Sequence, residues 1–281
     1  MRLLFLAAAL SASLSAAAHA TEGPDARQAY VERRGLIETD TRCNLLGADI
    51  RAALNVGAMQ ARGSLLRAGW TSAQVRGLEQ SVVQAAGQRP CNDTRTLQSA
   101  ADARRAFAPW LSAGYMEFPG WQRDWLARRG ASDGWRLSQA IDAPRAAVFG
   151  VRQQGAAQRL TLVLTLAPGE TAPMSVQLVQ RDVNRAAMRE IALPQRVAYG
   201  IQAGAPSPRG AMTVPSARTI ERLSGGRTQI AFTFPDNAFV ALLQLDPREA
   251  VELRVQSGRS VQSMYVEVGD IAAARAFVTL R

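Results

Sequence analysis

Hydrophobic residues recur at helical spacing in the first part of the chain and at every second position in the last part. Helical spacing extends from about Asp25 to Phe107, and the period-two pattern begins after Gly134. Amphipathic helices repeat every 3.6 residues, whereas half-buried strands repeat every two. The pattern therefore predicts an α+β protein: an N-terminal helical bundle, then an antiparallel β-sandwich-like or partly closed barrel domain.

The helical part shows three helices with recognisable ends. The first is expected to begin at Cys43 and to run to Arg67, with a turn at Gly69. Thr71-Ser72-Ala73-Gln74 has the spacing of a capping box, so a second helix should start there. Asn92 or Asp93 can cap the third.

The later part alternates apolar and polar residues in about seven segments. These are residues 160–166, 174–178, 230–234, 251–255 and 264–268, with weaker ones near 146–152 and 196–202. Residues 203–217 are rich in Gly, Pro, Ser and Ala and are expected to form a long loop. Two short helices should decorate the sheet, one capped by Asp236 over 237–245 and a final one capped by Asp270.

An aromatic connecting segment, 108–134, separates the helical domain, 21–107, from the β-rich domain, 135–281. Its candidate binding residues are Trp110, Tyr115, Trp121, Arg123, Trp125, Arg128 and Arg129. Aromatic rings beside arginines can stack on sugars or bases. Alternatively, the tryptophans pack one domain against the other. We then expect most of the surface of Trp110, Trp121 and Trp125 to be buried where the two domains meet.

The first twenty residues have the pattern of a secretion signal, with residues 1–20 as the signal peptide. Arg2 precedes an apolar run from Leu3 to Leu10, and Ala18-His19-Ala20 fits a signal-peptidase site. Mature protein should begin at Thr21. A retained membrane anchor is the alternative, but the run is short for a span. We expect a periplasmic or secreted protein that does not span a membrane after cleavage.

Export changes how the two cysteines are interpreted. In an oxidising compartment, two cysteines in a globular chain usually pair. A Cys43–Cys91 disulfide would join the start of the first helix to the end of the second, where an antiparallel return brings the chain back. The alternative, a redox or nucleophilic thiol, lacks a C-x-x-C neighbour and a histidine to activate it.

Basic residues outnumber acidic ones, and all 33 are arginine, giving a net charge of +10. Without the signal peptide the balance is 32 arginines against 23 acids, or +9, and no histidine remains. Schiff-base chemistry, His-ligated metal sites and most nucleophile–base pairs are therefore excluded, and we expect no metal site, cofactor or catalytic residue. The arginines are scattered, so nucleic acid is an improbable ligand, while an anionic surface stays possible.

Carboxylates are the strongest remaining catalytic candidates, since a glycosidase needs only two. Glu117 and Asp124 flank Trp121 in the connecting segment, although their spacing does not mark them as a pair. Among the later acids, Asp236 and Asp270 are interpreted as helix caps, and Glu252 and Glu267 should face outward on strands. The remaining acids of that cluster are Asp246 and Glu249.

Two resemblances concern the ends of the chain. Cys43, Ala61-Arg62-Gly63-Ser64-Leu65-Leu66-Arg67-Ala68-Gly69-Trp70 and Pro90-Cys91-Asn92-Asp93 resemble a family of uncharacterised exported proteins of Gram-negative bacteria, over residues 36–107. That resemblance implies paired cysteines and no known activity. The last fifty residues are similar in pattern to the end of secreted proteins akin to invasion-associated locus B: a short helix, two strands and a closing amphipathic helix.

These observations favour a non-enzymatic exported envelope protein that binds a protein or cell-wall partner. One alternative is a carboxylate-dependent glycan hydrolase, and a second is a binder of anionic lipid or lipopolysaccharide. Two facing carboxylates in one pocket would favour the hydrolase, whereas an aromatic surface without them would favour binding.

Overall fold

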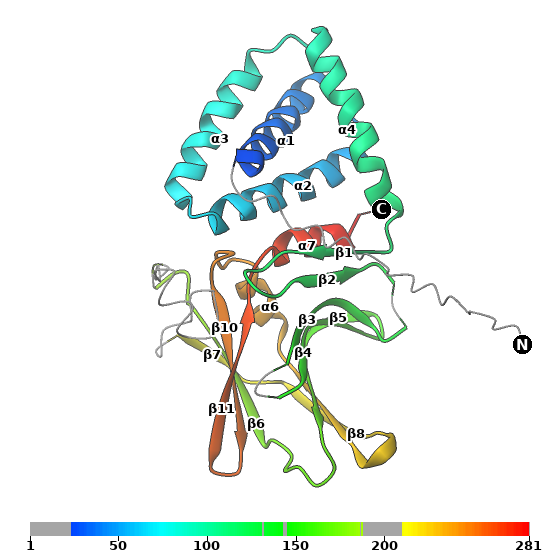
Figure 1. The fold of residues 1–281 in the computed structure, drawn as a ribbon, viewed down its shortest axis with the longest axis vertical. Helices are drawn as coiled ribbons and strands as arrows, with labels where there is room; N and C mark the ends of the chain where they lie inside the picture. Colours follow the sequence, from blue (N-terminus) through cyan, green and yellow to red (C-terminus); the bar gives the residue numbers. More distant parts are fainter. Residues whose placement is uncertain (1–23, 131, 143–144, 186, 188–209, 281) are drawn as a thin grey trace, which may run out of the picture.

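The computed structural model describes residues 24–280 apart from 131, 143–144, 186 and 188–209. The predicted signal peptide and the weak strand near 196–202 lie outside these residues. Within them the fold is α+β, as predicted: helices form the first region, and two antiparallel sheets follow. Figure 1 shows the helices at one end of the molecule, the sheets at the other, and the last helix between them.

Four helices make up the N-terminal region. They are α1 (Pro24–Cys43), α2 (Ala48–Arg67), α3 (Ser72–Gly87) and α4 (Thr94–Ser112). Helix α1 packs against both α2 and α3, while α4 packs on α2. Two small apolar clusters hold the bundle, one around Leu54 and Phe107 and another around Leu65 and Val75. Because these cores are small, further bonds between the helices add to the stability of the helical region.

The predicted disulfide is present, with 5.4 Å between the Cα atoms of Cys43 and Cys91. The expected start of a helix at Cys43 is wrong, because Cys43 is the last residue of α1. Asn44 adopts a positive φ of 49°, which ends α1. The Asp40 carboxylate then accepts a hydrogen bond from the Leu46 backbone N–H, 2.7 Å away. The disulfide therefore joins the corner between α1 and α2 to the loop before α4.

Helix signals in the sequence are confirmed at two further starts. Thr71 and Gln74 form the predicted capping box of α3, each side chain bonding to the other residue's backbone N–H. The Asp93 carboxylate caps α4. Helix α4 continues through Pro109 to Ser112, so Trp110 lies on a helix rather than in a connection.

Two sheets form the C-terminal region. The seven-stranded sheet contains, in spatial order, β1 (Tyr115–Phe118), β2 (Trp125–Arg128), β3 (Trp135–Ile141), β4 (Ala147–Gln154), β5 (Ala157–Leu166), β9 (Thr228–Thr233) and β8 (Ala217–Arg222). The four-stranded sheet contains β11 (Ser260–Glu267), β10 (Ala250–Ser257), β6 (Ser175–Gln180) and β7 (Ala211–Thr213). The expected long loop at 203–217 is wrong in its described part, because β7 lies within it and β8 begins at its last residue; residues 203–209 lie outside the described residues.

One hydrophobic core joins the two sheets, which makes the region sandwich-like as expected. Phe149 and Phe232 from the large sheet and Leu253 and Val266 from the small one share this core. Val56 of α2 also belongs to it. The core of the β-region therefore extends into the helical region, and the two parts pack as one molecule.

The two short helices are present, but their predicted caps are not. Helix α6 (Asp236–Leu242) follows Pro235, and α7 (Ile271–Val278) follows Asp270; neither helix has a side-chain cap. Asp236 instead pairs with Arg159. Helix α7 packs against α2 and against β1–β3, and it lies between the two regions (Figure 1). No helix among the described residues combines the length and apolar character needed to cross a membrane.

Candidate functional site

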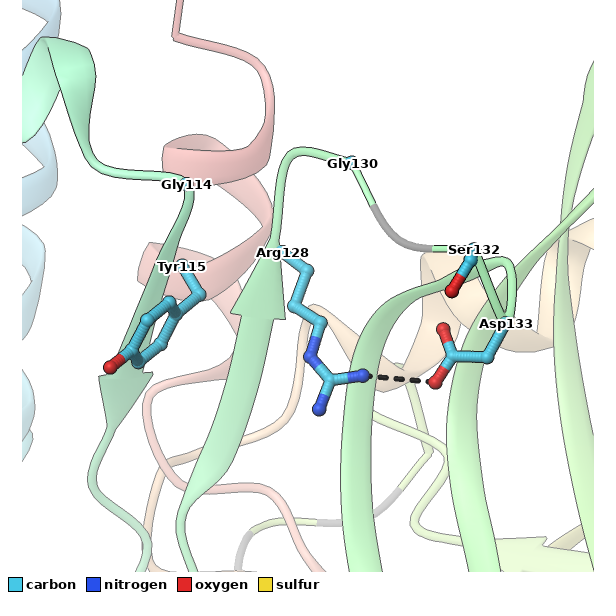
Figure 2. A pocket seen from close by; sticks show the side chains of 6 residues that line it. All are labelled: Gly114, Tyr115, Arg128, Gly130, Ser132 and Asp133. Carbon is cyan, nitrogen blue, oxygen red and sulfur yellow. Dashed lines mark hydrogen bonds and ion pairs between the residues drawn. The ribbon is translucent and has the colours of Figure 1, made fainter.

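Two of the predicted binding residues, Tyr115 and Arg128, line a pocket of about 410 Å³ on the large sheet. Its lining consists of Gly114, Tyr115, Arg128, Gly130, Ser132 and Asp133. Tyr115 at the start of β1 pairs in register with Arg128 at the end of β2. The Arg128 Nη1 lies 3.0 Å from the Asp133 carboxylate, and the dashed line in Figure 2 marks this ion pair. The pocket thus offers an aromatic ring and a guanidinium held in place by one acid.

Exposure distinguishes Tyr115 from the rest of the predicted set, and Arg128 beside it is partly exposed. The Tyr115 residue is 67% exposed, which is unusual for a large aromatic side chain. The Arg128 side chain is 34% exposed. Both can therefore contact a ligand without rearrangement of the sheet.

Trp110 and Arg129 instead belong to the packing between the regions. The Arg129 guanidinium donates to the Trp110 carbonyl at 2.7 Å and lies 4.3 Å from the centre of the Phe277 ring. Burial lowers the pKa of Arg129. Trp110 is half-buried and packs against both the core of the sheets and the core of α2 and α4. These residues connect α4, β2 and α7.

Trp125 is fully buried in the core of the sheets. Its indole N–H donates to the carbonyls of Glu267 and Val268, both 2.9 Å away. The expectation of burial is therefore confirmed for Trp125. Trp110 and Trp121 are only partly buried. No ligand could reach the Trp125 ring without unfolding this part of the sheet.

The backbones of Trp121 and Arg123 are bound by a buried carboxylate. Three consecutive N–H groups, of Trp121, Gln122 and Arg123, donate to one carboxylate oxygen of Glu267. Gly120 makes this approach possible, because a Cβ there would lie 2.5 Å from that oxygen. No sequence pattern indicates this contact, since 144 residues separate Arg123 from Glu267.

The carboxylates do not form a catalytic pair in the pocket. Glu117 and Asp124 are exposed and absent from its lining, where Asp133 is the one acid. Glu267 and Glu252, expected to face outward, are 0% and 8% exposed. The alternating pattern predicts exposure for both, but other residues cover them. The backbone of residues 120–123 covers Glu267, and Arg254 and Ser263 bond to Glu252.

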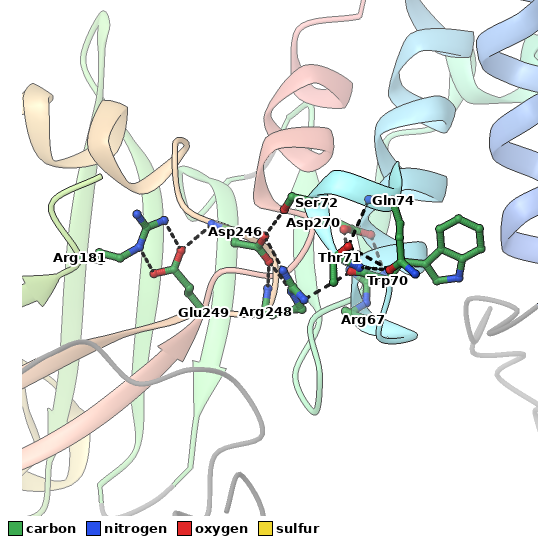
Figure 3. Close-up of polar contacts among 10 residues, drawn as sticks. All are labelled: Arg67, Trp70, Thr71, Ser72, Gln74, Arg181, Asp246, Arg248, Glu249 and Asp270. Atoms are coloured by element: carbon green, nitrogen blue, oxygen red, sulfur yellow. Dashed lines mark hydrogen bonds and ion pairs between the residues drawn. The ribbon is translucent and has the colours of Figure 1, made fainter. Parts of the chain in front are cut away.

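A second polar group, the polar junction, lies where the α2–α3 turn meets the loop before β10 (Figure 3). It contains the ion pairs Arg67–Asp270, Arg248–Asp246 and Arg181–Glu249. Arg67 and Asp270 are joined by two hydrogen bonds of 2.6 and 2.9 Å and are almost completely buried. Gly63 permits this contact, because a Cβ there would lie 1.8 Å from Asp270 Oδ1.

The protonation of the junction differs from acid to acid. Burial raises the pKa of the Asp270 carboxyl to about 6, against the opposing effect of the Arg67 guanidinium. Burial opposes ionisation of Asp246 too, but hydrogen bonds from Arg248 outweigh it and lower that pKa. Every carboxylate here has an arginine partner, so the junction is suited to fixing the two regions rather than to catalysis.

Among the residues that the structure describes, no group of three or more His, Cys, Asp or Glu side chains could hold a metal ion. The described residues also contain no free cysteine, since both are in the disulfide.

Comparisons with protein-family models, with curated proteins and with solved structures gave no match. The two resemblances noted from the sequence therefore stay expectations, and function has to be inferred from the site itself.

Proposed function

We propose that this chain is an exported, non-enzymatic protein of the cell envelope that binds a cell-wall glycan through the pocket around Tyr115. The observation that carries this proposal is the lining: an exposed tyrosine ring beside a guanidinium, on a rigid sheet. An aromatic face with a neighbouring polar group is well suited to a sugar ring. The signal-like N-terminus and the disulfide support an oxidising compartment such as the periplasm.

The lining supports binding over hydrolysis. Glycan hydrolysis requires two carboxyl groups on opposite sides of the bond, one of them protonated. Among the described residues that line the pocket, Asp133 is the one acid, and it forms an ion pair with Arg128. Ser132 has no histidine or lysine to activate it, because the chain has no lysine and its one histidine is at position 19.

Cosedimentation with purified peptidoglycan sacculi tests the proposal. Wild-type protein should pellet with sacculi, and Tyr115→Ala should weaken this binding about tenfold, the loss expected for one stacked ring. Met174→Ala is the matched control, because Met174 is 64% exposed and lies outside the pocket.

Three results would contradict the proposal. Equal binding by wild type and Tyr115→Ala would remove the pocket from consideration. Binding to lipopolysaccharide vesicles or to an envelope protein, but not to sacculi, would favour those partners. Release of soluble glycan fragments by wild type, lost in Glu117→Gln or Asp124→Asn, would show a hydrolase.

A further inference from the structure

Arginines form a row across the outer face of the large sheet, beginning at the pocket. Arg128 on β2 and Arg136 on β3 lie one step beyond the recorded pair Ala127–Leu137. Arg152 on β4 pairs in register with Trp135 on β3 and with Arg159 on β5. The arginine row, defined as Arg128, Arg136, Arg152 and Arg159, therefore occupies four adjacent strands.

A β-bulge places two of these residues together. The register of β3 and β4 shifts between Trp135 and Leu137, so that Trp135 and Arg136 both oppose Arg152. In such a bulge the two side chains point to the same face of the sheet. Trp135 is 9% exposed yet belongs to no described core cluster, and the Arg152 guanidinium lies 5.8 Å from its ring centre. The bulge thus directs Arg136 outward beside Arg152.

The row is unfavourable for the unliganded protein. Like charges opposite each other on neighbouring strands repel, and Arg152–Arg159 is such a pair. Among the described acids, Asp133 pairs with Arg128 and Asp236 with Arg159, so compensation is found at the two ends of the row. In the described part of the chain, Arg136 has no acidic partner, and Arg152 donates only to the Asp133 carbonyl. A local arrangement that opposes stability is a mark of a functional surface.

We propose that the arginine row binds the carboxylates of an acidic glycan, with Arg136 and Arg152 as its principal ligands. This inference rests on the proposed glycan binding at Tyr115, which the row extends across the sheet. A guanidinium binds a carboxylate through two parallel hydrogen bonds. Strands lie about 4.8 Å apart, so the row spans roughly 14 Å from β2 to β5 and can meet several charges of a polymer.

Other anionic partners fit the row less well. Single-stranded nucleic acid needs several exposed aromatic rings for its bases, whereas Tyr115 is exposed and Trp135 is covered. A bilayer surface needs apolar side chains that insert beside the charges. Among the described residues, the four strands that carry the row, β2 to β5, have no exposed large apolar side chain. An extended, hydrated polyanion requires neither.

The test measures binding of polygalacturonate, a glycan with one carboxylate per sugar, by titration calorimetry. Arg136→Gln and Arg152→Gln should each weaken the affinity about tenfold, as expected for loss of a charged hydrogen bond. Arg136→Lys keeps the positive charge but lacks the planar guanidinium that makes two parallel hydrogen bonds. It should therefore lose less affinity than Arg136→Gln. Arg76→Gln is the matched control: it removes the same charge from an exposed position on α3 and should leave affinity unchanged.

Several outcomes would overturn the inference. An equal loss of affinity in Arg76→Gln and Arg136→Gln would show that only the net charge of the protein matters. Binding of poly-glutamate as tightly as polygalacturonate would remove the preference for a glycan. If wild type binds sacculi through Tyr115 but does not bind polygalacturonate, the proposed function stands and the row has no part in it. If it binds neither, both proposals fail. Thermal unfolding of each variant verifies that it is folded.

Discussion

Glu267 shows how much one buried side chain can organise. Its carboxylate is 0% exposed, and one oxygen accepts three consecutive backbone N–H groups between β1 and β2. The other oxygen, Oε1, has no hydrogen-bond partner among the described residues. The Gln139 amide also joins this group, donating to the Glu267 carbonyl and accepting its N–H. Glu267 therefore fixes the β1–β2 turn to the end of β11.

Glu267→Gln should lower the free energy of unfolding by about 1–3 kcal/mol. The glutamine amide keeps the shape of the carboxyl group, but its NH₂ group would replace one of the two carboxylate oxygens. A hydrogen-bond donor would then be buried where the protein now has an acceptor. Urea denaturation measures the effect, and Glu117→Gln, exposed on β1, should change stability by less than about 0.5 kcal/mol. Equal effects in the two variants would show that the turn does not depend on Glu267.

Asp270 gives a pH dependence whose sign can be worked out. Its pKa in the folded protein is about 6, above the ordinary 3.8, with Arg67 and Asp124 as the charged groups acting on it. A carboxyl with a raised pKa stabilises the fold most below its ordinary pKa, and this contribution falls as pH rises through 6. The difference in unfolding free energy between wild type and Asp270→Asn should therefore decrease by roughly 2 kcal/mol from pH 4 to 7. Denaturation at several pH values measures it, and a difference that grows with pH would contradict the raised pKa.

Neither role could be predicted from the sequence. Asp270 precedes an amphipathic segment, as a helix cap does, but its partner Arg67 is 203 residues away. Glu267 alternates correctly for an outward position, and only the folded path of residues 120–123 covers it. Local pattern determines the backbone at these positions, whereas distant contacts determine what the side chain does.

For helices and strands, the sequence predicts those ends that are marked by capping residues close by in the chain. The capping box at Thr71 and the Asp93 cap are confirmed because they involve residues within one turn. The end of α1 was missed because Asn44, not glycine, adopts the positive φ there. The arginine row was also missed, because it depends on the register of four strands and on the bulge at Trp135. Register across a sheet is not visible in the alternation of a single strand.

The Cys43–Cys91 disulfide closes a loop with a sequence separation of 48, and the helices inside it have thin cores. Reduction should remove roughly 4 kcal/mol of stability in the chain-entropy treatment. The helical region should consequently melt at lower temperature, with less effect on the sheets. Far-UV circular dichroism follows the helices, and near-UV signals of Trp125 follow the sheets. Thiols that titrate freely in protein purified without reductant would exclude this bond.

The whole molecule depends on contacts between its two regions. Trp110 packs against the cores of both, Arg67–Asp270 joins α2 to the start of α7, and Val56 enters the core of the sheets. Apolar and paired-charge contacts of this kind hold domains in one arrangement, whereas a bare linker leaves them free to move. The pocket and the arginine row are thus presented on a sheet supported from behind by α7.

Trp110→Ala should loosen this arrangement. Since Trp110 is half-buried, the expected loss is roughly 2 kcal/mol, less than for Trp125→Ala in the core, at about 3–5 kcal/mol. Trp121→Ala should also cost less than Trp125→Ala, because Trp121 is only partly buried, whereas Trp125 is fully buried. Calorimetry should show separate melting of helices and sheets in Trp110→Ala alone. A single transition at the wild-type temperature would contradict the role of Trp110.

Hydroxyl-radical footprinting with and without purified sacculi would locate the binding surface on the whole molecule. Tyr115 is 67% exposed and should react in the free protein, whereas the buried Tyr30, at 2%, should not. Met174, at 64%, serves as an exposed reference away from the pocket. Glycan binding at the pocket predicts that sacculi protect Tyr115 and leave Met174 reactive. Protection of Met174 with Tyr115 still reactive would place the binding surface elsewhere.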